Sequence, residues 1–137
     1  MLGSAQVPRP PPVVLLVDPD QDSRLMYRCW LQDCNGLVVR EAGSVSDALR
    51  VIGDHCPDVI ATELAFPGED ANELCRRVRG NVVTRAALLI ALTASVTPAH
   101  VQRAYFAGCD IVLAKPCLPS TLLEAIRELL PPSRPPE

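Results

Sequence analysis

The sequence predicts an α/β fold in which a five-stranded parallel sheet carries helices on both faces. Short apolar, partly β-branched runs alternate with longer amphipathic segments five times along the chain. The strand-like runs are continuously apolar, which is typical of strands that are buried on both faces of a sheet. Strands that alternate with helices in this way imply parallel pairing and right-handed crossovers.

Each element follows from its local pattern. The apolar runs predict strands at 13–17, 37–41, 59–62, 87–92 and 110–114. The segments that follow them predict helices at 20–33, 45–54, 70–79, 98–107 and 119–130. Apolar residues at helical spacing mark the predicted core faces of three helices: Leu25, Cys29 and Trp30; Ala48, Val51 and Ile52; and Leu122, Ile126, Leu129 and Leu130.

Capping residues set the predicted ends of the helices. The residues suited to helix starts are Ser44 or Ser46, Asp70, Thr97 and Ser120. Glu69 stands beside Asp70 before the third helix, where acidic side chains interact favourably with the helix N-terminus. Gly36 and Gly108 suit chain reversals after helices.

The length and the prolines indicate one domain with two tails. At 137 residues the chain can bury a core without metal or disulfide staples. Residues 1–12 and 131–137 hold eight of the fourteen prolines and are predicted to be disordered or extended. The folded domain is therefore expected to span residues 13–130.

The composition argues against nucleic acid and membranes as direct partners. The net charge of −3 at pH 7 gives no general attraction for either. No stretch approaches the roughly 20 apolar residues of a membrane span, and the N-terminus lacks the build of a signal peptide. The six cysteines form no CxxC pair, which favours buried reduced thiols in a cytoplasmic protein. A redox role for Cys109 and Cys117, which flank Lys115, is the alternative.

Four polar residues follow or end the predicted strands. The stretch 57–71, PDVIATELAFPGEDA, runs from a buried strand into Glu63 and then into a turn. Asp18, Thr93 and Lys115 stand at the ends of other strands. An open α/β sheet gathers such residues in one crevice, where ligands bind. Two carboxylates near a lysine and a hydroxyl suit a divalent cation and a phosphoryl group.

The chain resembles a bacterial response-regulator receiver domain over nearly all of residues 13–130. The motifs that carry the resemblance are VLLVD, PDVI followed by an acid and PGED, IALTAS and AGCDIVLAKP. The resemblance implies a flavodoxin-like (βα)5 sheet with strand order 2-1-3-4-5, a topology for which a receiver is an established example. It also implies that Glu63 stands at the phospho-acceptor position, and that Thr93 and Lys115 contact the phosphoryl group.

The metal and acceptor positions depart from the family's pattern. Asp18 matches the first of an acidic pair, but Pro19 replaces the second, which in the family binds magnesium directly. Asp20 lies one residue further on and need not substitute for it. Glu63 replaces the acceptor aspartate. Because Mg²⁺ demands near-ideal octahedral geometry, the lost ligand and the extra methylene are expected to impair a magnesium site at Asp18 and Asp20.

Two further departures affect the switch. Ala71 replaces the glycine of the family's usual Asp-Gly pair, and Val112 fills the switch position that an aromatic residue usually occupies. Together these departures predict a non-enzymatic pseudo-receiver of a two-component phosphorelay. It would need no cofactor and would act by protein–protein interaction. Glu63 would either mimic the phosphorylated state or be a solvated acid that pairs with Lys115.

Two other functions stay open on the residues alone. One is an active response regulator that accepts phosphate from a histidine kinase with Mg²⁺ at Asp18 and Asp20. The other is a small-molecule binding domain that reuses the crevice. The resemblance implies partner binding through residues 98–130, to a histidine kinase, another receiver, an output protein or a second copy of the chain. That face would include Arg103, Tyr105 and Arg127 if they point outward.

Overall fold

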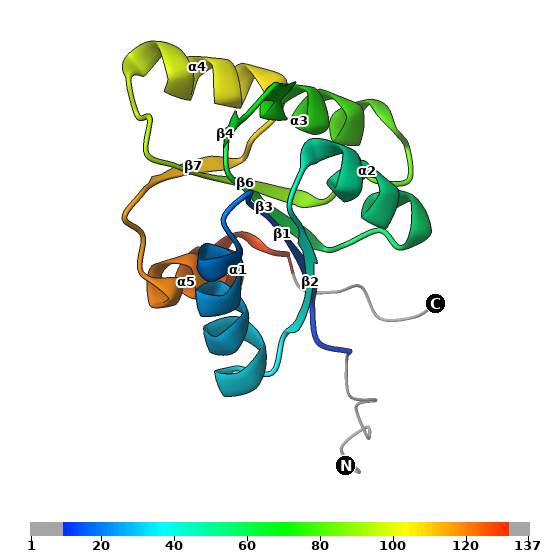
Figure 1. Ribbon diagram of the computed structural model, residues 1–137. Coiled ribbons are helices and arrows are strands. Elements are labelled where there is room, and N and C mark those ends of the chain that lie inside the picture. Colours follow the sequence, from blue (N-terminus) through cyan, green and yellow to red (C-terminus); the bar gives the residue numbers. More distant parts are fainter. Residues whose placement is uncertain (1–9, 132–137) are drawn as a thin grey trace, which may run out of the picture.

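The computed structural model describes residues 10–131 and contains a parallel sheet of five strands (Figure 1). The elements in chain order are β1 (Val13–Val17), α1 (Gln21–Arg28), η1 (Cys29–Cys34), β2 (Val38–Ala42), α2 (Val45–Asp54), β3 (Val59–Thr62), β4 (Ala65–Phe66), β5 (Glu69–Asp70), α3 (Ala71–Gly80), β6 (Leu88–Thr93), α4 (Pro98–Ala107), β7 (Ile111–Ala114) and α5 (Pro119–Leu129). The strand order is β2-β1-β3-β6-β7, with every pair parallel. Counted along the chain, this is the predicted order 2-1-3-4-5, so the expected fold class is confirmed.

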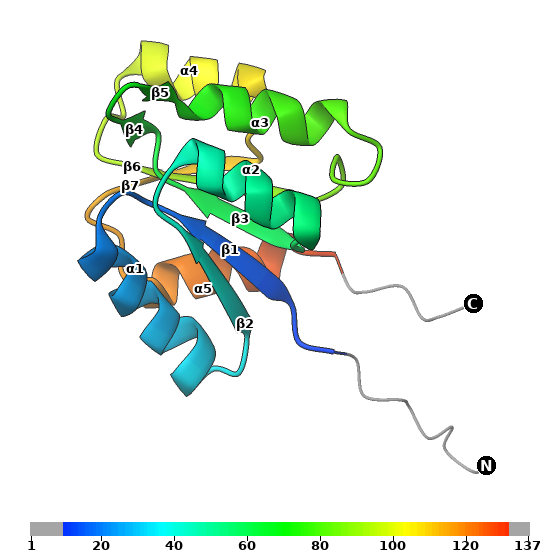
Figure 2. The same cartoon turned by 45° about the vertical axis from the view of Figure 1, so that its right-hand side comes forward.

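The sheet separates two apolar layers, which Figures 1 and 2 show as helices above and below it. Helices α2, α3 and α4 cover one face, and α1 and α5 cover the other. Alternate residues of β1 point into the two layers: Leu15 and Val17 pack with the first group, and Val14 and Leu16 with the second. The central strands are therefore buried on both faces, which explains their continuously apolar sequences.

The predicted boundaries agree with the structure to within one residue, except that two features are new. The first helix ends in η1, a π-helical segment that continues directly from α1. A short antiparallel pair, β4 and β5, precedes α3. The two are joined by Pro67 and Gly68, and Gly68 has a φ of 71°. A Pro-Gly pair with positive φ at the glycine suits a type II turn, so the loop signal at these residues marks a hairpin.

The predicted core face of the first helix is wrong. Leu25 and Trp30 are 48% and 39% exposed, and Cys29 is also exposed. The buried residues of this helix are Tyr27 and Leu31. Tyr27 lies in the core cluster, and its hydroxyl donates a hydrogen bond of 2.8 Å to the carbonyl oxygen of Cys117, which satisfies its polar group there. A hydrophobicity pattern misses this arrangement because it scores tyrosine as partly polar and cannot see a distant acceptor.

The core faces of the second and last helices are predicted better. Ala48 and Ile52 are buried, and Val51 packs partly buried against the same cluster. In α5, Leu122 and Ile126 are buried. Leu129 is exposed, which corrects the prediction at the last turn of the helix.

Three of the predicted helix caps are present. Ser44, Asp70 and Thr97 each accept a hydrogen bond from a backbone amide in the first turn of their helix. Ser120 is not a cap, because α5 begins at Pro119 and has no side-chain cap.

Glu69 serves a different helix from the one expected. Its carboxylate accepts hydrogen bonds from the Val45 and Ser46 amides and from the Ser46 hydroxyl, so it caps α2 rather than α3. These hydrogen bonds lower the pKa of Glu69 below its usual value. The hairpin of β4 and β5 carries Glu69 to α2, and only the folded chain brings the two together.

The cysteines do not all fit the expectation of buried thiols. All six are free. Cys75, Cys109 and Cys117 are buried, whereas Cys29 and Cys34 are exposed and Cys56 is half-buried. The expectation therefore fails for the two in η1, which lie on the outer side of that segment.

Part of the predicted domain organisation lies outside the described residues. The described residues do not include 1–9 and 132–137, which make up most of the two proline-rich tails. Within residues 10–131, no helix has the length and apolar character required to cross a membrane.

Arg79 ties α3 to the β6 and β7 side of the sheet. Its guanidinium donates hydrogen bonds to the carbonyl oxygens of Gly108, Arg85 and Ala87, at 3.0, 2.6 and 2.7 Å. It also donates to Asp110 Oδ2 at 2.8 Å. Gly108 has a φ of 119°, and a Cβ there would lie 2.6 Å from Arg79 Cγ, so this approach requires glycine.

We expect Arg79→Met to lower the free energy of unfolding by roughly 2–3 kcal/mol, because it leaves several carbonyl oxygens without their donor. Urea denaturation followed by circular dichroism measures the change. The matched control is Arg50→Met, since Arg50 is an exposed arginine whose ion pair among residues 10–131 is with the partly exposed Asp47. It should change stability by less than about 0.5 kcal/mol. Equal effects of the two substitutions would contradict this role of Arg79.

Candidate functional site at the carboxyl ends of the strands

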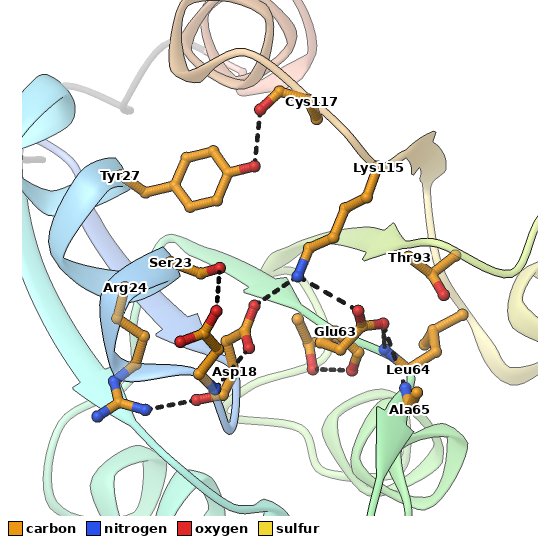
Figure 3. Close-up of polar contacts among 12 residues, drawn as sticks. Asp18, Ser23, Arg24, Tyr27, Glu63, Leu64, Ala65, Thr93, Lys115 and Cys117 are labelled. Atoms are coloured by element: carbon orange, nitrogen blue, oxygen red, sulfur yellow. Dashed lines mark hydrogen bonds and ion pairs between the residues drawn. The ribbon is translucent and has the colours of Figure 1, made fainter.

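The sheet itself places the polar residues of the site. The Asp18 amide donates to the Ala42 carbonyl at the end of β2, and the Glu63 amide donates to the Val17 carbonyl at the end of β1, at 3.0 and 2.8 Å. The Lys115 amide donates to the Thr93 carbonyl at 2.8 Å. Each residue thus continues the hydrogen-bond ladder one step beyond its strand. This anchoring sets the three side chains on the same edge of the sheet (Figure 3).

Lys115 joins the two carboxylates of the site. Its Nζ lies 2.7 Å from Asp18 Oδ2 and 3.2 Å from Glu63 Oε1. Figure 3 shows the lysine side chain reaching between the two acids. The side chains of Lys115, Asp18 and Glu63 are only 20%, 10% and 9% exposed. We call these three residues the ion cluster.

The charge of Lys115 is maintained in spite of burial. Burial alone favours the neutral amine. The hydrogen bond to Asp18 and the charges of Asp18 and Glu63 outweigh it, and the pKa of Lys115 is raised above its ordinary value of 10.5. The ion cluster therefore contains one ammonium group between two acidic side chains.

The Glu63 side chain turns back over its own backbone. Its Oε2 accepts hydrogen bonds from the Leu64 amide at 2.5 Å and from the Ala65 amide at 3.2 Å. Its Oε1 faces Lys115. The additional methylene of glutamate allows the carboxylate to reach these three donors at once. The carboxylate thereby occupies hydrogen-bond donors that an incoming anion would otherwise use.

The acids near the start of α1 are also engaged. Asp18 Oδ1 accepts from the Asp20 amide at 2.8 Å, and Asp18 Oδ2 accepts from Lys115. Asp20 is the N-cap of α1, where its carboxylate accepts from the Asp22 amide and the Ser23 hydroxyl. These bonds, the one from Ser23 first, lower the pKa of Asp20. Among residues 10–131, no group of three or more His, Cys, Asp or Glu side chains is placed to hold a metal ion.

Thr93 lies at the end of β6 but belongs to a separate contact. It is almost completely buried, and its hydroxyl oxygen accepts from the Ser95 amide at 3.2 Å. Figure 3 shows Thr93 beside the ion cluster without a dashed line to it. Thus the structure joins the side chains of Asp18, Glu63 and Lys115, and places Thr93 next to them, linked to Lys115 through its backbone carbonyl but not through its hydroxyl.

Val112 lies in the middle of β7 and packs partly buried against the core. Its amide donates to the hydroxyl oxygen of Tyr105 in α4, at 3.2 Å. An aromatic side chain from α4 therefore contacts β7 at Val112. The sequence placed Tyr105 on the predicted partner face but did not indicate this contact.

Two supporting residues were missed. Tyr27 holds the segment after Lys115 by its bond to the Cys117 carbonyl, and burial raises the pKa of Tyr27 above its usual value. Arg24 donates to the Asp18 carbonyl at 2.5 Å and pairs with Glu41 at 3.1 Å. Neither residue has a local sequence signal, because their partners are backbone carbonyls or a side chain that is distant in the sequence.

A small cavity adjoins the site. It has a volume of about 240 Å³ and is lined in part by Leu64, Ala65, Thr93, Ser95 and Arg103. Ligand pockets for drug-sized molecules usually have volumes of roughly 300–1,000 Å³. The cavity therefore does not favour the small-molecule alternative over the others.

Comparison with known proteins agrees with this architecture. Residues 14–127 match the response regulator receiver domain. The chain is 32% identical over 118 residues to the transcriptional activator protein ExaE of Pseudomonas putida. The matched region covers 85% of this chain and 54% of ExaE. It is 31% identical over 115 residues to an uncharacterized 14.6 kDa protein of Leptolyngbya boryana, with coverage of 84% and 87%.

A solved structure shows the same arrangement in three dimensions. The chemotaxis response regulator CheY4 of Vibrio cholerae superposes with a TM-score of 0.81 at 28% identity, over 88% of this chain and 99% of CheY4. The chain spans about half the length of ExaE and of the response regulator Rre1 of Synechocystis. The matched residues, the strand order and the polar residues at the strand ends lead to one conclusion: the chain belongs to the response regulator receiver domain family.

Proposed function

We propose that this receiver domain acts as a pseudo-receiver, a signalling module that binds protein partners without a cycle of phosphorylation. The observation that carries the proposal is the position of Lys115 Nζ between Asp18 and Glu63, at 2.7 and 3.2 Å. In this arrangement the acidic groups are already paired with a cation of the protein. The domain needs no cofactor and catalyses no reaction of its own.

The donor set does not fit a magnesium ion of the family's kind. Magnesium requires near-octahedral oxygen ligands at roughly 2.0–2.1 Å. Pro19 offers no side-chain oxygen, Asp20 caps α1, and both Asp18 oxygens accept hydrogen bonds. An ion would have to displace Lys115 and the helix cap together. This supports a site that stays closed to the metal.

The contacts of Glu63 hold its carboxylate in one position, and they reproduce only part of the contacts expected of a phosphoryl group. Its carboxylate engages Lys115 and the amides of Leu64 and Ala65. Thr93, the second phosphoryl-contact position, bonds to the Ser95 amide instead. Glu63 therefore reproduces the lysine contact of a phosphorylated acceptor without the hydroxyl contact. The switch pair is also altered, since Val112 carries no aromatic ring.

We place partner binding on residues 98–130. Arg103, Tyr105 and Arg127 are exposed there, as is Phe106, which is 94% exposed on α4. An exposed aromatic residue beside arginine is typical of protein interfaces. The proposed partners are a histidine kinase, another receiver, an output protein or a second copy of the chain, in the cytoplasm. An active regulator that uses Mg²⁺ is the rival function.

Removal of Lys115 tests the ion cluster. We expect Lys115→Met to lower the free energy of unfolding at pH 7 by roughly 3 kcal/mol, because two buried carboxylates lose their cation. Adding Asp18→Asn and Glu63→Gln to this variant should restore most of the loss. Urea denaturation measures all three proteins. A loss below about 0.5 kcal/mol for Lys115→Met would mean that Glu63 and Lys115 form a solvated surface pair.

The same cluster predicts a dependence on pH. Because the pKa of Lys115 is raised on folding, its contribution to stability is complete below 10.5 and is lost as the pH rises through the higher pKa of the folded state. The difference in stability between the wild type and Lys115→Met should therefore shrink above pH 10.5. Urea midpoints at pH 8 and at stepwise higher pH values measure it. A constant difference would contradict the raised pKa of Lys115 in the folded state.

Phosphorylation separates the proposal from its rival. The wild type, incubated with acetyl phosphate and Mg²⁺, should gain no phosphoryl group by intact mass spectrometry. The double variant Pro19→Asp and Glu63→Asp, which restores both acids, should gain one. Its single components are the matched controls. If the wild type gains a phosphoryl group that Glu63→Gln does not, the domain is an active acceptor and the proposal fails.

A further inference from the structure

Two buried thiols from distant parts of the chain lie against each other. Cys75 is in α3, and Cys109 lies between α4 and β7, 34 residues further along. Their Sγ atoms are 3.5 Å apart, and both side chains are buried. Within residues 10–131, each thiol has the other as its hydrogen-bond partner. No other pair of cysteines in the described residues makes such a contact.

Backbone and side-chain hydrogen bonds hold the elements that carry the pair. Cys75 faces the core from α3, beside Leu74 and Val78. Cys109 follows Gly108, and its amide donates to the Ala104 carbonyl at the end of α4. Arg79 fastens α3 to the Gly108 carbonyl at the same point. The two sulfur atoms are thus brought together by the packing of α3 against the end of α4.

We infer that Cys75 and Cys109 form a reversible disulfide when the domain meets a peroxide, and that this bond joins α3 to the segment that enters β7. The inference goes beyond the proposed function, because it adds an oxidative input to a domain whose phosphoryl site is closed. It stands on the thiol pair and does not depend on the ion cluster.

The chemistry assigns different roles to the two sulfur atoms. The hydrogen bond with Cys109 lowers the pKa of Cys75, against the effect of burial and with help from Arg79. The same contact, together with burial, raises the pKa of Cys109 far above its usual value. Within the proposal we assign Cys75, which lies on the same helix as Arg79, as the nucleophile, and Cys109 as the thiol that resolves the intermediate.

The reaction balances with one peroxide. The Cys75 thiolate attacks one oxygen of hydrogen peroxide, the O–O bond breaks, and the departing hydroxide leaves as water after taking up a proton, so that Cys75 becomes a sulfenic acid. The sulfur of Cys109 then attacks Cys75 Sγ and loses its proton, the S–O bond breaks, and a second water leaves. Two thiols are oxidised and one peroxide is reduced to two waters.

The geometry allows the bond and predicts a slow rate. A disulfide requires sulfur atoms about 2.05 Å apart, so the pair must approach by roughly 1.5 Å through side-chain rotation and a small shift of α3. Cys75 is fully buried, so peroxide reaches it only during local opening of the packing. The exposed thiols of Cys29 and Cys34 react independently and are removed in the test below.

The experiment uses the full chain with Cys29→Ser and Cys34→Ser, treated with hydrogen peroxide under native conditions. The expected result is a loss of two hydrogens by intact mass and a Cys75–Cys109 peptide in a non-reducing digest. The unfolding midpoint should rise by roughly 5–10 °C, since the link closes a long loop, and dithiothreitol should reverse the change.

Three further variants in that background give the controls. Cys117→Ser, which removes a buried thiol outside the pair, should leave the crosslink intact. Cys109→Ser should abolish it and leave an oxidised Cys75, and Cys75→Ala should abolish it if Cys109→Ser does not fold. A crosslink to Cys56 or Cys117, or no crosslink in a protein that remains folded by circular dichroism, would overturn the inference.

Discussion

One ammonium group organises the functional end of this domain. Lys115 Nζ lies between the carboxylates of Asp18 and Glu63. Lys115 follows β7, whereas the two acids follow β1 and β3, and β6 lies between these strands and β7 in the sheet. All three side chains are largely shielded from water. Isolated buried charges are costly, whereas a cation shared by two carboxylates offsets that cost. The positions of the strand ends therefore decide whether the two acids can share one cation, and the backbone hydrogen bonds of Asp18, Glu63 and Lys115 fix those positions.

That constraint shows how the family scaffold is retained while the residues at its strand ends differ. The parallel ladder still delivers Asp18, Glu63 and Lys115 to one edge, because the backbone bonds do not depend on side-chain identity. Replacing an acid by Pro19 removes an oxygen, and lengthening the acceptor at Glu63 lets it reach the Leu64 and Ala65 amides. The two acids then take their counter-charge from Lys115 within the chain, and under the function proposed above signalling is left to surfaces and, as inferred, to the buried thiols.

Sequence patterns performed best where a residue's role is local. Ser44, Asp70 and Thr97 cap their own helices, and apolar runs define the sheet. Sequence patterns failed where the role of a residue depends on a partner that is distant in the sequence. The hydroxyl of the buried Tyr27 donates to a carbonyl 90 residues away, and Glu69 caps a helix that precedes it. Arg79 has no periodicity that would reveal its carbonyl acceptors, and the Cys75–Cys109 contact joins two unrelated segments.

By itself the sequence determined the order of the elements, the fold class and the set of polar residues at the strand ends, because hydrophobic period and strand-end position are local properties. Only the tertiary structure decided which of these groups touch. It showed that Lys115 pairs with both acids, that Thr93 bonds to Ser95 rather than to Glu63, and that Asp20 caps α1. The physical reason is that a hydrogen bond needs atoms aligned within about 3 Å, and that alignment exists only after packing has set the distances between elements.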